Sequence, residues 1–203
     1  MNAPRFLKPF IPFLLAFVLP LVAIYAWWGG FRDVAIQPGT GGPYAYVYLE
    51  QKGDYSKLTE LAGEVARELA AQKIEPGLPI TVLYSNPDLV DVGKRVGRAG
   101  YLLPTGVQVR PPLLQDTIPA RPVLIARIQA GSLLAPGKAY AALDEYQQAR
   151  GRGIVMPTVE IYRSSGTPLE MGLLTVEMED GPQRAPEGQG SLREDQESSG
   201  EDR

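Results

Sequence analysis

Residues 157–162 read PTVEIY, and residues 79–84 read PITVLY. The two stretches lie 78 residues apart (157 − 79), and residues 123–131 (VLIARIQAG) follow residues 45–53 (AYVYLEQKG) at the same spacing. Two similar stretches at one spacing indicate that a unit of this length has been duplicated. A period of 78 residues is too long for a solenoid. The sequence therefore predicts one domain made of two related halves.

Both halves show the same predicted order of elements, in which a strand precedes an amphipathic helix and two further strands. In the first half these elements lie near 45–50, 56–72, 80–85 and 100–103, and in the second half near 123–128, 136–150, 158–163 and 173–178. We therefore predict an α+β fold, a duplicated β-α-β-β domain at 44–178, with repeats at 44–104 and 122–178.

An uncharged segment, FIPFLLAFVLPLVAIYAWW at residues 10–28, precedes this domain. As a helix it would be roughly 28 Å long at about 1.5 Å per residue, which suits a transmembrane helix. A short basic N-terminus (1–9) precedes it, and a linker rich in glycine and proline (29–43) follows it. After the domain, residues 179–203 are polar and are predicted to form a disordered acidic tail.

The membrane orientation is predicted from few charges. Arg5 and Lys8 precede the apolar segment, whereas Arg32 after it is offset by Asp33. The positive-inside rule then places the N-terminus in the cytoplasm and the domain on the far, periplasmic or extracytoplasmic, side. The alternative is a cleaved signal peptide, which the length of the segment and the lack of an A-x-A site after it disfavour.

The composition excludes several classes of site. The chain has no cysteine and no histidine, so a disulfide framework, a Ser-His-Asp triad and the commonest zinc ligands are absent. We expect no metal and no cofactor. Its net charge of −3 provides no basic face for nucleic acid, which we do not expect as a partner.

Strand periodicity gives the candidate site. Side chains alternate across a strand, so Glu160 and Tyr162 share one face of 158–163, and Tyr46 and Tyr48 share one face of 45–50. If the aliphatic faces pack on the helices, the polar faces meet, together with Tyr84, at a groove between the halves. Aromatic walls with one carboxylate suit a flat or cationic organic ligand.

A structural explanation remains open for each of these residues. Glu160 could lie on a solvated face, or it could pair with an arginine such as Arg127. Each tyrosine could belong to ordinary core or edge packing.

Three motifs resemble the GyrI-like small-molecule-binding superfamily over about residues 44–178. These are GDYSKL at 53–58, YSNP at 84–87 and PTVEIY at 157–162. The resemblance implies a duplicated β-α-β-β fold with a groove between its halves, and a glutamate at the position of Glu160 that meets ligands. Some members of the superfamily are thought to hydrolyse cyclopropane-bearing toxins with that carboxylate and an aromatic residue.

The order of anchor, domain and tail is also similar to that of a testis-expressed autophagy receptor of the endoplasmic reticulum. That receptor needs an aromatic-x-x-aliphatic motif in its tail, and residues 179–203 contain no aromatic residue, so its role does not transfer.

We predict a membrane-anchored ligand-binding module rather than an enzyme, with Glu160, Tyr162, Tyr48, Tyr84 and Tyr46 as ligand-binding residues. The first alternative is a hydrolase with Glu160 and Tyr162 as catalytic residues. The second is a membrane scaffold whose protein partner the sequence does not identify.

Overall fold

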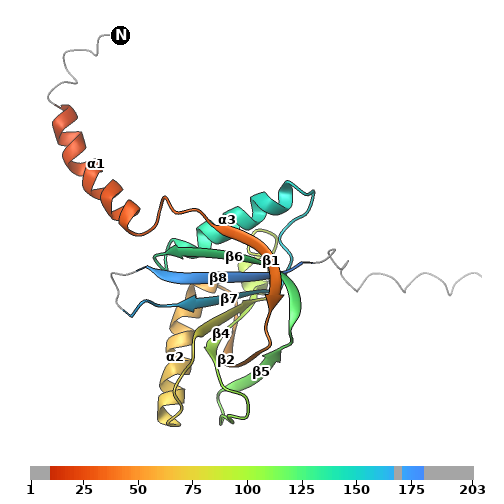
Figure 1. Ribbon diagram of the computed structural model, residues 1–203. Coiled ribbons are helices and arrows are strands. Elements are labelled where there is room, and N and C mark those ends of the chain that lie inside the picture. The colour runs from red at the N-terminus through yellow and green to blue at the C-terminus, as the bar shows by residue number, and fades with distance from the viewer. Residues whose placement is uncertain (1–9, 167–170, 181–203) are drawn as a thin grey trace, which may run out of the picture.

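The chain folds around one antiparallel sheet of eight strands (Figure 1). The computed structural model describes residues 10–166 and 171–180, with side chains from residue 14 onward. Its long elements are α1 (Phe10–Trp27), β1 (Ala35–Gly41), β2 (Tyr44–Lys52), α2 (Leu58–Ala71), β3 (Pro79–Leu83), β4 (Val96–Leu102), β5 (Leu114–Ile118), β6 (Arg121–Ala130), α3 (Ala135–Gln148), β7 (Thr158–Arg163) and β8 (Gly172–Glu179). Two short 3-10 helices lie at Tyr55–Lys57 and Val92–Lys94. The fold is thus mixed α+β, as predicted.

The strand order is symmetric about the centre of the sheet. It runs β1-β6-β8-β7-β3-β4-β2-β5, so that β2, β4 and β3 of the first half mirror β6, β8 and β7 of the second. Each half also contributes one helix between its first two strands, α2 or α3. The order of elements in space supports the duplication that the sequence predicts.

The gapless alignment at 78 residues is wrong, because it pairs residues on opposite faces of the sheet. Val47 packs with α2 residues in one core cluster, and its residue equivalent toward α3 is Leu124, at an offset of 77. In the central strands, Ile80 and Val159 share the other face, at an offset of 79. A register shift of one residue turns every side chain to the other face of a strand. The two halves therefore align only with a local shift.

Two strands were not predicted. β1 lies inside the expected linker at 29–43, and β5 lies between the repeats; each extends the sheet at one edge. β1 pairs with β6 from Ala35↔Arg127 to Gly41↔Arg121. The linker prediction is wrong for 35–41, because seven residues of backbone are held in the sheet.

The two helices pack on one face of the sheet, which we call the outer face. Leu58, Val65 and Leu69 of α2 are buried, and Ala139 and Leu143 of α3 are fully buried against β6 and β8. The opposite face, which we call the inner face, carries its own buried apolar cluster around Ile80, Val82 and Val159. Both faces of the central strands are therefore covered, although helices cover only the outer one.

Two connections that cross over between the edge strands close the sheet at one end. The chain passes from β1 to β2 through Gly42 and Pro43, and from β5 to β6 through Pro119 and Ala120. A Cβ on Gly42 would lie 2.8 Å from the Pro119 carbonyl oxygen, and Gly42 has a φ of +74° that favours glycine. The two edges of the sheet therefore meet at this point.

The helix α1 projects away from the sheet (Figure 1). Its end is fixed to the domain, since Gly131 donates a backbone hydrogen bond to the Trp28 carbonyl (3.0 Å) and Lys138 donates to the Gly30 carbonyl (2.5 Å). Over the part of the chain that the structure describes, no helix combines the length and the apolar character needed to cross a membrane. The basic segment 1–9, and the predicted tail from residue 181 on, lie outside the described residues.

Candidate functional site

The inner face carries a cluster of three tyrosines from the first half of the chain. Tyr46 and Tyr48 lie on β2 with their ring centroids 5.2 Å apart and their planes 30° apart, while Tyr84 follows β3. Tyr46 is 2% exposed and Tyr48 is 7% exposed, whereas Tyr84 is 38% exposed. We call these three residues the tyrosine cluster. The prediction that they lie near one another on one surface matches their arrangement.

A guanidinium group lies against the tyrosine cluster. The Arg98 Cζ is 4.3 Å from the ring centroid of Tyr48 and 4.9 Å from that of Tyr84. Its Nη1 donates to the Tyr46 hydroxyl (3.1 Å) and to Asp116 Oδ2 (2.7 Å). Sequence reasoning missed Arg98, although an arginine within the glycine-rich strand 96–102 is a visible signal.

These contacts perturb the titration of the cluster. Burial raises the pKa of Tyr46, against the opposing effect of its hydrogen bond with Arg98. Burial alone would lower the pKa of Arg98, but the hydrogen bond to Tyr46 and the neighbouring Tyr84 raise it overall. The guanidinium therefore remains charged.

A second polar group lies at the closed end of the inner face. Tyr44 donates a hydrogen bond of 2.5 Å to Glu177 Oε1, and Arg121 Nη2 lies 3.9 Å from Glu177 Oε2. Glu177 is 3% exposed, and its Oε2 has no hydrogen-bond partner among the described residues; nor do the two terminal nitrogens of Arg121. Burial, followed by the hydrogen bond to Glu177, raises the pKa of Tyr44.

Glycine makes room for this buried carboxylate. Gly41 ends β1, and a Cβ at that position would collide with Glu177 Oε2 and would lie 3.1 Å from Val123 Cγ2. The strand β1 is therefore bare where the Glu177 side chain lies over it. The signal in the sequence was the alternation in 172–179, where Thr175 and Glu177 interrupt an apolar pattern on one face only.

Glu160 and Tyr162 lie on the outer face, away from the tyrosine cluster. Glu160 pairs across β8 with Val176, which packs in the core cluster beneath α3, and Tyr162 packs against that same cluster. Val159 belongs instead to the inner cluster with Tyr46 and Tyr48. The prediction that Glu160 and Tyr162 share a groove with the three tyrosines is therefore wrong.

The error has a physical cause. We assigned the aliphatic face of β7 to the helices on the assumption that only one face of the sheet is buried. The curled sheet buries its inner face as well, so Val159 and Ile161 find apolar neighbours there. The same assumption holds for β2, where Val47 faces α2 and the tyrosines face inward.

Glu160 is stabilised by its own partner beneath the helices. The Tyr140 hydroxyl on α3 donates to Glu160 Oε1 (2.9 Å) and lies 2.7 Å from Thr158 Oγ1. Burial raises the pKa of Glu160, and the hydrogen bond from Tyr140 partly opposes that effect. Burial also raises the pKa of Tyr140, followed by the effect of the nearby carboxylate.

The proposed catalytic pair is not coupled by a shared partner. The Tyr162 hydroxyl accepts a hydrogen bond from the Gly172 backbone (3.2 Å), while Glu160 accepts from Tyr140. Arg127, the alternative partner for Glu160, lies on β6 in a row with Ile161 and Thr175 and thus on the other face.

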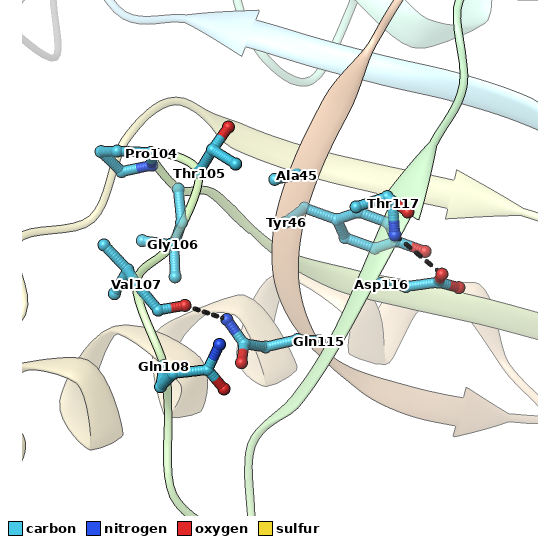
Figure 2. A pocket seen from close by; sticks show the side chains of 11 residues that line it. Ala45, Tyr46, Pro104, Thr105, Gly106, Val107, Gln108, Gln115, Asp116 and Thr117 are labelled. Atoms are coloured by element: carbon cyan, nitrogen blue, oxygen red, sulfur yellow. Dashed lines mark hydrogen bonds between the residues drawn. The ribbon is translucent and has the colours of Figure 1, made fainter.

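A surface hollow of about 370 Å³ lies beside β2 and β5 (Figure 2). The loop from Leu103 to Gln108 forms one wall, and Gln115 and Asp116 of β5 form the other. Gln115 donates to the Val107 carbonyl (2.7 Å) across the hollow and so ties the loop to the strand. Tyr46 and Asp116 line both this hollow and the surroundings of Arg98.

The residues that the structure describes contain no group of three histidine, cysteine, aspartate or glutamate side chains placed to hold a metal ion. The side chains available on the inner face are thus aromatic, guanidinium and carboxylate groups.

No protein-family model matches the chain, and no curated protein matches it. Solved structures do resemble it. EcmrR, in a cryo-EM complex with DNA, superposes with a TM-score of 0.54 at 12% identity, covering 87% of this chain and 72% of that one. The crystal structure of the EcmrR C-terminal domain gives 0.53 at 15% identity, covering 72% and 96%. The fold is thus similar to that of the EcmrR C-terminal domain and is consistent with a GyrI-like fold.

Proposed function

We propose that the protein is a small-molecule-binding module whose ligand, an aromatic or cationic organic compound, binds on the inner face of the sheet. The observation that carries the proposal is a buried carboxylate, Glu177, with one oxygen unbonded among the described residues, on the same face as three tyrosines. A buried charge that lacks a full set of partners is costly unless a bound group completes it. The fold shared with EcmrR is consistent with a binding module.

In this proposal Glu177 takes the role that the sequence suggested for Glu160. Tyr44 orients its carboxylate by donating to Oε1, which leaves Oε2 to face Arg121 or a ligand. Tyr48 and Tyr84 offer ring faces, on which cations and flat groups bind favourably. With its net charge of −3, the chain is expected to bind such compounds rather than nucleic acid.

The test is isothermal titration of the full chain, in detergent, with a panel of lipophilic aromatic cations such as a tetraphenylphosphonium salt. We expect Glu177→Gln to weaken binding at least about tenfold, since a charge-assisted contact contributes about 1.5–3 kcal/mol. Glu160→Gln is the matched control on the outer face and should bind as the wild type does. Equal affinity in Glu177→Gln, or a loss confined to Glu160→Gln, would reject the assignment.

We also propose that residues 10–28 anchor the domain to a membrane, with the N-terminus in the cytoplasm and the domain on the far side. Because no described helix meets the requirement for crossing, this proposal rests on the uncharged sequence and on the exposure of its side chains. Leu19, Leu21 and Ile24 are all more than half exposed on α1. Apolar side chains exposed around a helix need a lipid or protein environment.

The anchor is tested by fractionating cells that express the full chain or a chain lacking residues 1–28. We expect the full chain to stay in the membrane fraction after alkaline carbonate extraction and the shortened chain to be released. Protease added to sealed inside-out vesicles should leave the domain intact. Release of the full chain by carbonate would refute the anchor, and digestion of the domain would refute the orientation.

A further inference from the structure

The ring faces of the tyrosine cluster are already in contact with a cation. Arg98 places its guanidinium between Tyr48 and Tyr84, with the Cζ 4.3 Å and 4.9 Å from the two ring centroids. Both distances are within the range of about 6 Å in which a cation is attracted to an aromatic face. A planar organic cation would seek this same position.

Anionic groups complete the surroundings of this guanidinium. Asp116 Oδ2 accepts from Nη1 at 2.7 Å, and Glu50 Oε2 lies 3.4 Å from Nε. The Tyr46 hydroxyl accepts a third contact at 3.1 Å. Three different strands, β2, β4 and β5, thus supply a box that fits a flat cation with several N–H donors.

The box is reachable from outside. The side chain of Arg98 is 19% exposed, and that of Asp116 is 46% exposed. Tyr84, the outer wall, is 38% exposed, and the surface hollow shares Tyr46 and Asp116 with the box. A guest could therefore enter if the guanidinium left.

We propose that Arg98 is an intramolecular guest of a planar-cation site formed by Tyr46, Tyr48, Tyr84, Asp116 and Glu50. The side chain determines the specificity of the inner face, since it keeps free organic cations out of the tyrosine cluster and leaves Glu177 as the carboxylate open to a ligand. This inference rests on the proposed function only for its meaning in ligand selection; the occupied box itself is tested separately.

Removing the guest should create a binding site for its missing part. Arg98→Ala deletes a fragment equivalent to ethylguanidinium and leaves two carboxylates and three rings behind. We expect ethylguanidinium, at millimolar concentration, to bind this variant at least tenfold more tightly than the wild type in isothermal titration, and to raise its unfolding temperature. Butylammonium carries the same charge without the planar fork, and should do so much less.

Two further variants keep the test informative. If Arg98→Ala does not fold, Arg98→Met retains an apolar stem over the rings and should bind methylguanidinium instead. Adding Asp116→Asn to either variant should weaken that binding at least threefold, because one of the two carboxylates is lost. Equal binding of ethylguanidinium to the wild type and Arg98→Ala, or no preference over butylammonium, would overturn the inference.

The outcomes separate this inference from the proposed function. If the wild type binds aromatic cations through Glu177 but Arg98→Ala gains no guanidinium binding, the role of Arg98 is refuted alone. If Arg98→Ala gains that binding but the wild type binds nothing in the panel, the ligand-binding function is refuted and the internal guest stands.

Discussion

The Tyr140 hydroxyl should be the main support of the buried Glu160, and its removal should be costly. Tyr140→Phe deletes a donor that lies 2.9 Å from Glu160 Oε1 and 2.7 Å from Thr158 Oγ1, while the ring stays in place. A hydrogen bond to a charged group contributes about 1.5–3 kcal/mol, so the free energy of unfolding should fall by about that amount at neutral pH.

The cost should depend on pH. Burial raises the pKa of Glu160 above 4.5, so its carboxyl binds a proton more tightly in the folded than in the unfolded chain. Its contribution to stability is therefore complete below the unfolded pKa and is lost as pH rises through the folded one. Because the Tyr140 bond favours the charged form, Tyr140→Phe raises the pKa of Glu160 further and widens that window.

Thermal unfolding of the full chain in mild detergent, followed by circular dichroism between pH 4 and pH 8, measures both effects. Tyr146→Phe is the matched control on the same helix, because the contacts of Tyr146 run through its ring and its carbonyl. Glu160→Gln should abolish the pH dependence and most of the additional cost of Tyr140→Phe. A loss in Tyr140→Phe equal to that in Tyr146→Phe at every pH would refute the reasoning.

Three other substitutions test the packing at the closed end and in α2, each by thermal unfolding against the wild type. Gly41→Ala should destabilise by about 1–3 kcal/mol, because its Cβ meets the Glu177 carboxylate; a wild-type melting temperature would show that β1 shifts freely. Gly63→Ala should stabilise by about 0.5–1 kcal/mol, since no atom lies within 4 Å of its Cβ inside α2; destabilisation would contradict the helix. Tyr44→Phe should cost about 1.5–3 kcal/mol by leaving Glu177 with both oxygens unbonded, and an unchanged stability would mean that solvent already reaches Glu177.

The order of elements in the two repeats could be predicted from the sequence, because helix and strand periods differ. Strand 158–163 and the helices at 58–71 and 135–148 match their predicted positions closely. The edge strands could not be predicted, since β1 reads AIQPGTG and carries neither alternation nor β-branched residues along most of its length. Its pairing with β6 comes from the fold, which brings the two segments together.

The candidate site was only half predictable. The alternation in 45–50 correctly assigned Tyr46 and Tyr48 to one face, and that face is the inner one. The same rule cannot say which face of β7 meets the helices when both are buried, and so Glu160 was placed on the wrong side. Distant contacts such as Tyr44 with Glu177, 133 residues apart, depend on closure of the sheet and have no local signal.

The crossed connections have a consequence for how the two halves depend on each other. β1 precedes the first half in the chain but pairs with β6 of the second, and β5 precedes the second half but pairs with β2 of the first. Each half thus lends its leading strand to its sibling. A half severed from the chain would present a bare edge and an orphaned strand, and a pair of identical halves could satisfy both only by trading strands, as in a swapped dimer.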